Sequence, residues 1–206
     1  LFLFYRNFKK IFRNINLGKK NIFSSDNKKE RWKRVFFIAF GQSKMFDKPL
    51  VAILHLIVYL GFIIVNIELI EIIIDGLFGT HRALSFLGSF YNFLIASFEI
   101  LAFLVLICVV IFLIRRNIIK VKRFLSSEMK GWPTLDGNLI LIFEILLMLA
   151  FLTMNAADSI LLVYYPEKYI NVGLFPISSF LIVPFIENLS TQTLIFLERF
   201  CWWFHI

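Results

Sequence analysis

Charged residues are scarce in this chain of 206 residues: they make up 17% of it, whereas hydrophobic residues make up 59%. Soluble domains contain about 25% charged and 45–50% apolar residues. A soluble fold of this size could not bury so much apolar surface, because part of every folded chain stays exposed. The composition therefore excludes a disordered chain, argues against a water-soluble enzyme and indicates an integral membrane protein.

The sequence also lacks the motifs on which many enzymes depend. Its two cysteines, Cys108 and Cys201, lie inside apolar runs, so neither a disulfide framework nor a thiolate metal site is indicated. We find no glycine-rich phosphate loop, no Ser/His/Asp set and no pair of catalytic carboxylates. With only three histidines, any imidazole chemistry depends on very few residues.

Three apolar runs are long enough to cross a membrane, at about 50–74, 93–114 and 139–162. A spanning helix needs about 20 apolar residues. Shorter apolar runs at 1–5 and 194–206 are interpreted as pieces of two further spanning helices, cut by the ends of the sequence. The prediction is an all-α integral membrane protein, a five-helix bundle with truncated first and last helices.

Local signals predict where two of these helices begin and where one ends. Pro49 suits the first turn of the first span, and Asp75 with Gly76 is expected to end it. Asp136 or Asn138 is expected to cap the third span.

Lysine and arginine are distributed unevenly along the chain. Of the 22, 13 lie in 6–48 and 6 in 115–130, which leaves three for the rest of the sequence. Cytoplasmic loops carry such an excess, so 6–48 and 115–137 are predicted to be cytoplasmic, and 75–92 and 163–193 to lie outside.

The basic loop 6–48 is expected to face anionic lipid headgroups. A nucleic-acid-binding arm is the alternative, since the segment combines cations with aromatic rings, but no nucleic acid partner is predicted. Residues 27–40 are expected to form an interfacial amphipathic helix. Its apolar face would consist of Trp32, Val35, Phe36 and Ala39.

Two histidines, His55 and His205, lie within apolar segments. An imidazole in hydrocarbon needs a partner, which leaves a haem ligand, a proton relay or a hydrogen bond between helices. Burying Glu198 with Arg199 is costly, so this pair is expected at the outer surface. His55 and His205 would then lie about 14 Å apart along the membrane normal. If the last helix instead enters the membrane near Thr191, His55 and His205 lie at the same depth.

Four carboxylates within the apolar runs are candidates for a proton or quinone site: Glu68, Glu71, Glu99 and Asp158. A buried charge is costly in a bilayer, and proton transfer would justify that cost. Alternatively, these groups lie near the interface or carry their protons. Tyr91 and Trp132 are interpreted as residues of the aromatic interface belt.

A family resemblance rests on two stretches and the histidines within or near them. Residues 41–49 (GQSKMFDKP), followed by Leu54-His55 and Gly61-Phe62, resemble the membrane domain of bacterial iron–sulfur oxidoreductases. These are similar to heterodisulfide reductase subunits. The closing run 198–205 (ERFCWWFH) is similar as well. The fold resembles the gamma subunit of respiratory nitrate reductase, in which five helices hold b-type haem.

The resemblance implies that His55 and His205 bind one or two b-type haems, with further ligands and 4Fe–4S clusters in a soluble domain beyond residue 206. Where the nitrate reductase subunit has a second histidine, this chain has Val65. His81 is a possible substitute, although a histidine in an exposed loop is the simpler interpretation.

Taken together, the residues and the resemblance predict that 1–206 is the membrane domain of an oxidoreductase. It would sit as a multi-pass protein in a bacterial inner membrane and transfer electrons between quinone and cytoplasmic Fe–S clusters, with a soluble electron-transfer partner or a larger membrane complex. The alternative is a haem-free membrane anchor or accessory subunit. A proton channel or transporter ranks last, because no Gly/Pro pair interrupts the spans.

Overall fold

The computed structural model describes residues 2–18, 27–41 and 43–205, and these contain helices but no strand. The chain divides into two compact units, Leu1–Asp47 and Lys48–Ile206. Each unit is described by itself.

The N-terminal unit contains α1 (Phe2–Asn16), α2 (Lys28–Arg34), the π-helical turn η1 (Val35–Phe40) and the 3₁₀ turn η2 (Ser43–Asp47). Asn27 caps α2 by accepting a hydrogen bond from the backbone N–H of Glu30 at 3.3 Å. The helix predicted over 27–40 therefore forms, as α2 continued by η1. No residue of α1, α2 or η1 is buried.

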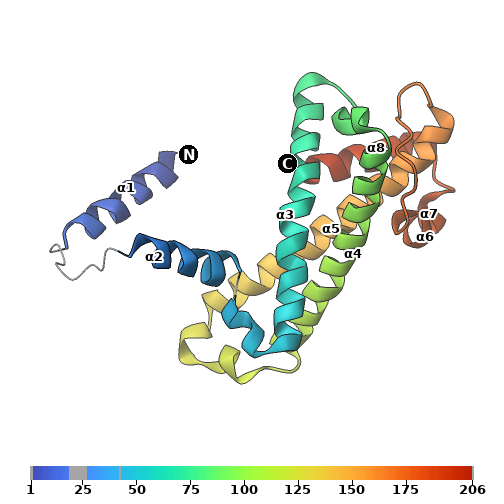
Figure 1. Cartoon of the computed structure of the whole chain (residues 1–206). Helices are drawn as coiled ribbons and strands as arrows, with labels where there is room; N and C mark the ends of the chain where they lie inside the picture. Colours follow the sequence, from blue (N-terminus) through green and yellow to red (C-terminus); the bar gives the residue numbers. More distant parts are fainter. Residues whose placement is uncertain (1, 19–26, 42, 206) are drawn as a thin grey trace. The chain divides into compact units, whose positions relative to one another are not determined.

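Three long helices form the frame of the second unit (Figure 1): α3 (Pro49–Phe78), α4 (Ser89–Asn117) and α5 (Trp132–Tyr164). All three are long and apolar enough to cross a membrane. A helix of 30 residues is about 45 Å long, more than the hydrocarbon thickness of about 30 Å, so polar turns extend past the apolar runs. Helix α4 packs against both α3 and α5.

The helix ends correct part of the prediction. Pro49 does lie in the first turn of α3, but Asp75 and Gly76 do not end it, because the helix continues until Gly79 adopts a left-handed conformation (φ 67°). Neither Asp136 nor Asn138 caps α5, which begins at Trp132 after Gly131 (φ 77°). Gly79 and Gly131 set these boundaries, because glycine has no Cβ and can adopt a positive φ without steric cost.

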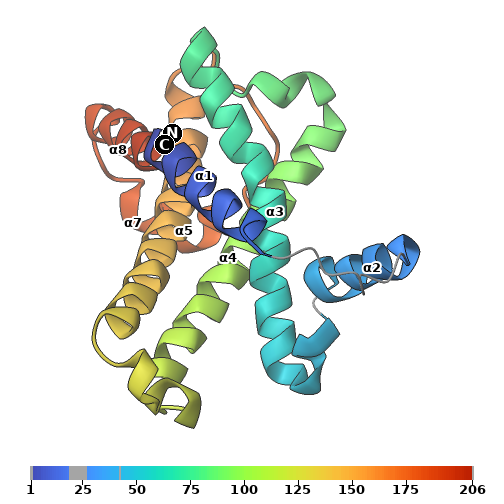
Figure 2. The same ribbon diagram turned by 90° about the vertical axis from the view of Figure 1, so that its left-hand side faces the viewer.

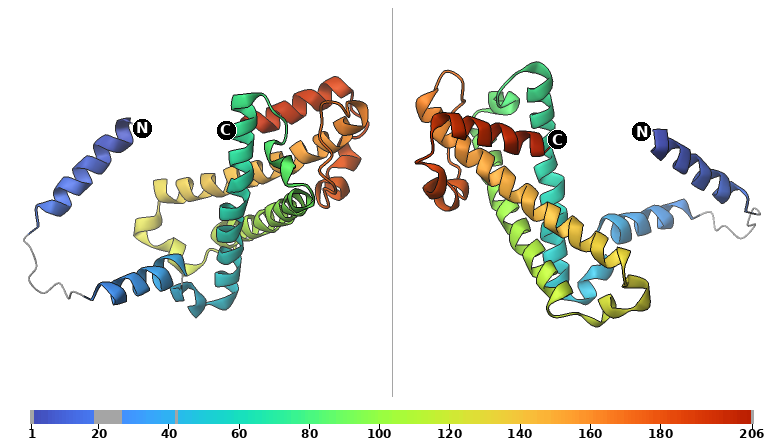
Figure 3. Two further views of the ribbon diagram at one scale, coloured as in Figure 1. Left: turned by 45° about the horizontal axis from the view of Figure 1, so that its top comes forward. Right: turned by 180° about the vertical axis from the view of Figure 1, so that it is seen from behind.

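Short helices follow α5: α6 (Ser178–Leu181), α7 (Val183–Ile186) and then α8 (Thr191–Phe204). Helix α8 packs along α5 and returns toward α3, as the two views in Figure 3 show. At 14 residues α8 is too short to be a complete span, and α1 has 15 residues. Among the described residues only α3, α4 and α5 are long and apolar enough, so the predicted bundle of five helices stays a prediction.

Two glycines allow helices to approach closely. A Cβ added at Gly61 of α3 would lie 2.4 Å from Cγ2 of Val105, a buried residue of α4. A Cβ added at Gly76 would lie 2.6 Å from the indole of Trp202, on α8. The first glycine sets the spacing of α3 and α4, and the second places α8 against the last turns of α3. The loop from α3 to α4 follows directly at this end of the unit (Figure 2).

Candidate functional site

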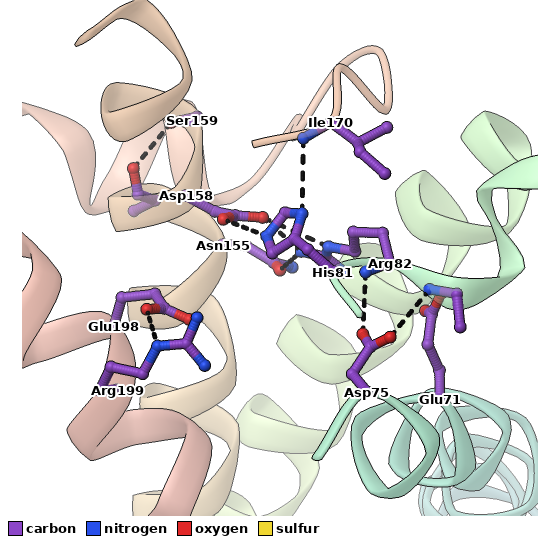
Figure 4. A network of polar contacts seen from close by, with 12 residues as sticks. Glu71, Asp75, His81, Arg82, Asn155, Asp158, Ser159, Ile170, Glu198 and Arg199 are labelled. Carbon is purple, nitrogen blue, oxygen red and sulfur yellow. Dashed lines mark hydrogen bonds and ion pairs between the residues drawn. The ribbon is translucent and has the colours of Figure 1, made fainter. Parts of the chain in front are cut away.

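The loop after α3 directs one arginine into the protein. Asp75 accepts hydrogen bonds from the backbone N–H groups of Arg82 (2.8 Å) and Ala83 (3.0 Å) and from the hydroxyl of Thr80 (2.6 Å). Arg82 has a left-handed backbone (φ 58°), which is costly for a residue with a side chain and persists only where surrounding contacts hold it. Its side chain is only 6% exposed. Figure 4 shows this side chain directed toward Asn155 and Asp158.

The guanidinium of Arg82 joins α3 to α5. Nη1 donates to Glu68 at 3.0 Å, while Nη2 donates to Asn155 at 2.7 Å and to Asp158 at 3.1 Å. Burial alone would lower the pKa of Arg82, but Asp158 and the other acidic groups outweigh burial and raise that pKa well above its ordinary value. Arg82 is therefore a fixed positive charge at the centre of a buried network.

Glu71 extends the network along α3 to α4. Its carboxylate accepts a hydrogen bond from the hydroxyl of Tyr91 at 2.7 Å and one from the backbone N–H of Leu84 at 2.8 Å. Tyr91 is 1% exposed, so its assignment to the interface belt is wrong. Its hydroxyl faces the network, and its ring belongs to the core.

Glu99 of α4 connects the network to the segment after α5. It accepts hydrogen bonds from the amide of Asn155 (3.1 Å), from the backbone N–H groups of Ile177 (2.9 Å) and Ser178 (3.2 Å), and from the Ser178 hydroxyl. Asn155 thus lies between Arg82 and Glu99, accepting from one and donating to the other. The carboxylate of Glu99, which is fully buried, has several donors and no adjacent cation.

His81 has protein partners at both ring nitrogens. Nδ1 accepts a hydrogen bond from the backbone N–H of Ile170 at 3.4 Å, so the proton of the neutral ring is on Nε2, which lies 3.0 Å from Asp158. In this arrangement neither nitrogen is available to a metal. The ring packs edge-on against Tyr169.

A small cavity of about 30 Å³ lies beside the network, between α3, α5 and α8. Its lining combines acidic and basic groups with the indole of Trp202. Glu198 reaches it from α8, is 3% exposed and lies 3.0 Å from Nε of Arg199. The expectation that Glu198 marks the exposed surface is therefore wrong, since its neighbour Arg199 provides a counter-charge.

The structure brings together the four carboxylates that the sequence singled out, Glu68, Glu71, Glu99 and Asp158. The sequence did not identify Arg82, which pairs with Glu68 and Asp158, as the cation at the centre of the network. The only available signal was a single arginine, beside a histidine, in a loop that otherwise lacks cations.

His205 ends α8 beside a different, apolar hollow. Its Nδ1 lies 3.1 Å from the carbonyl oxygen of Cys201, and its Nε2 is buried with no hydrogen-bond partner among the described residues. The hollow has a volume of about 150 Å³ and is lined on one side by α3 and on the other by α5. Its lining residues are Gly61, Phe62, Val65, Asn66, Leu69, Val105, Glu144, Leu147, Met148 and His205.

His55 lines a third hollow at the opposite end of the three long helices. This hollow has a volume of about 370 Å³ and is lined by three cations, Lys48, Arg115 and Arg116. The His55 ring stacks on Phe112 with 4.5 Å between ring centroids. The hollows of His55 and His205 share no lining residue.

Within the described ranges, no group of three or more His, Cys, Asp or Glu side chains could hold a metal ion. Comparison with protein-family models, with curated proteins and with solved structures finds no match to this chain. The class that fold and composition define is an all-α protein with three helices apolar enough to cross a membrane.

Proposed function

We propose that this chain is the membrane domain of an oxidoreductase, which carries electrons through b-type haem between membrane quinone and cytoplasmic Fe–S clusters in a bacterial inner membrane. The observation that carries the proposal is the buried Nε2 of His205, which has no hydrogen-bond partner in the described part of the chain. A polar atom in such a place is costly unless a ligand completes it.

The geometry of His205 fits an iron ligand. The carbonyl oxygen of Cys201 can only accept a hydrogen bond, so the proton of the neutral ring is on Nδ1 and the lone pair is on Nε2. Metal-binding histidines are usually held in this way through the other nitrogen. The adjacent hollow is mainly apolar, and its volume of about 150 Å³ is below the range of about 300–1,000 Å³ typical of cofactor sites, so most of a haem would extend past it.

The hollow beside His55 fits the same group in a different way. Phe112 and Phe124 offer flat apolar walls, and Lys48, Arg115 and Arg116 offer partners for the carboxylates that haem carries. Since each hollow contains one histidine, each haem would need a second axial ligand from elsewhere. When bound, the haem supplies one-electron chemistry, and the protein sets its position and its potential.

The Arg82 network is proposed to handle the protons of the quinone reaction. It contains more carboxylates than cations, and Oε2 of Glu68 is buried without a hydrogen-bond partner in the described residues. Carboxylates that one guanidinium cannot neutralise are suited to hold protons in an apolar setting. The cavity next to Asp158, Glu198 and Trp202 has a volume of about 30 Å³, enough for water but not for a quinone ring, so the ring is proposed to bind beside this cavity and not within it.

A haem-free membrane anchor is the second candidate. It is favoured by the packing of both imidazoles on protein rings, since His55 stacks on Phe112 and His205 lies edge-on to Phe151 at 6.2 Å. In that case the histidines contribute packing and hydrogen bonds only.

A reduced-minus-oxidised absorption spectrum of the full-length protein, purified from haem-replete cells, separates the two. We expect b-type bands, with less haem bound in His205→Ala and in His55→Ala. His81→Gln is the matched control and should retain the bands, because both its ring nitrogens are already engaged. A protein without haem, or with bands unchanged in both alanine variants, would favour the anchor.

A further inference from the structure

The first helix of the N-terminal unit presents an apolar stripe that is exposed among the described residues. Phe4, Phe8 and Phe12 follow one another at intervals of four residues, and their rings stack with centroids 6.3 and 6.4 Å apart. They are 56–72% exposed, and Ile15, one turn further, is 70% exposed. Residues four apart lie on the same face of a helix, so these side chains form one continuous surface.

The opposite side of α1 is strongly basic. Its four cations are Arg6, Lys9, Lys10 and Arg13, in which each of the two lysines lies three or four residues from each arginine. The helix contains no acidic residue. Successive turns therefore carry cations on one face and rings on the other. A helix with this division, a cationic face and a Phe-rich face, is typical of one that lies flat in a lipid interface.

The second helical segment repeats the pattern. Trp32, Phe36 and Phe40 lie four residues apart through α2 and η1, with ring centroids 6.4 and 5.7 Å apart, and all are exposed. The cations of α2 greatly outnumber its single acid, Glu30. The chain then passes through η2 directly into α3, so a bilayer that α3 crosses is within reach.

Charge decides between the possible partners of these two surfaces. A second copy of the unit would bring two sets of cations together, which is unfavourable. A nucleic acid would neutralise the cations and leave the two rows of rings without a continuous apolar partner. An anionic lipid leaflet satisfies both faces, because headgroups pair with the cations while acyl chains cover the rings.

We propose that α1 and the α2–η1 segment are membrane-surface helices, which lie in the headgroup layer of an anionic leaflet with their rows of aromatic rings toward the acyl chains. The proposal concerns lipid binding by the N-terminal unit and does not depend on haem or quinone. The proposal places α1, Phe2–Asn16, at the membrane surface, where the sequence predicts a piece of a spanning helix at 1–5, and that prediction is the alternative to it.

Cysteine labels at two neighbouring positions test the proposal in the full chain, one on the apolar face of α1 and one on its basic face. Phe8→Cys and Lys9→Cys are made separately, with Cys108 and Cys201 replaced by Ala, and carry an environment-sensitive fluorophore in lipid nanodiscs. In discs containing phosphatidylglycerol, we expect the label at position 8 to be shielded from iodide and the label at position 9 to be quenched. In phosphatidylcholine discs, we expect both to be quenched.

Charge removal on the same helix provides the matched variant. Each basic residue near an anionic surface contributes to binding, so Arg6→Gln with Arg13→Gln should lower the ratio of shielded to accessible label at position 8 about tenfold or more. Equal quenching at both positions in anionic discs would overturn the proposal. So would equal shielding of position 8 in both lipids, or shielding of both positions in phosphatidylcholine discs by an added oligonucleotide.

Discussion

Around Arg82 the protein supplies partners for most of its own buried polar groups, with Oε2 of Glu68 as an exception, whereas at His205 it leaves one ring nitrogen without a hydrogen-bond partner among the described residues. Both regions belong to the same helical unit and both place polar atoms among apolar ones. At Arg82 the contacts come from three long helices and two loops, and they hold these elements together. At His205 the surroundings are apolar, so the free nitrogen points to a ligand from outside the described chain.

The hydrogen-bond partners of a buried polar residue, and not its degree of burial, indicate whether it has a structural role or is a candidate for ligand binding. Glu99 is fully buried, yet backbone and side-chain donors surround it. His205 is less deeply buried, yet its Nε2 makes no hydrogen bond in the part of the chain that the structure describes. A satisfied group contributes stability and order, and an unsatisfied one is a candidate for ligand binding.

The largest effect is expected from removal of the charge at the centre of the network. Arg82→Met leaves Glu68 and Asp158 without their cation, so we expect a loss of about 3–5 kcal/mol in the free energy of unfolding. Unfolding in detergent, followed by circular dichroism, measures it. Arg34→Met is the control, since its pair with Glu30 is exposed and contributes about 0.5 kcal/mol or less. Equal losses in both variants would refute the central role of Arg82.

A smaller effect distinguishes two buried tyrosines. Tyr91→Phe removes the donor to Glu71 and should cost about 1–3 kcal/mol. Tyr169→Phe should change stability little, because the Tyr169 hydroxyl is buried and makes no hydrogen bond within the described residues. The same unfolding measurement tests both. If Tyr169→Phe proved the more damaging, counting partners would be a poor guide to the energetics of this region.

The smallest effect appears only at high pH. Burial raises the pKa of Tyr169 to about 12, above its ordinary value of 10. The folded state thus favours the neutral hydroxyl: its contribution is fully present below pH 10 and is lost as the pH rises from 10 to 12. Ultraviolet titration of phenolate formation, compared with Tyr169→Phe, measures this. A tyrosine that ionises near pH 10 at this position would contradict its burial.

Composition and run length predicted the three long helices because membrane crossing is set by short-range apolarity, which the sequence shows directly. The helix ends were harder to predict. The end of α3 depends on Gly79 and the start of α5 on Gly131, both of which adopt positive φ. Both lie beyond the apolar runs, where composition gives no signal.

The four carboxylates were predictable as unusual residues, but the cation that pairs with two of them, Glu68 and Asp158, was not. Arg82 and Asp158 are 76 residues apart, and only the packing of α3 and α5 around the loop brings them together. Tyr91 was misassigned for a related reason. Helix α4 is apolar on all sides, so its sequence does not reveal which face turns inward.

Gly76 has one further consequence, for the depth of His205. The indole of Trp202 occupies the space that a side chain at position 76 would fill. Sliding α8 toward the middle of α3 would bring the indole against Ile72 or Ile73, whose side chains close packing does not accommodate. The contact therefore limits how far α8, and with it the imidazole three residues later, can move toward the middle of α3.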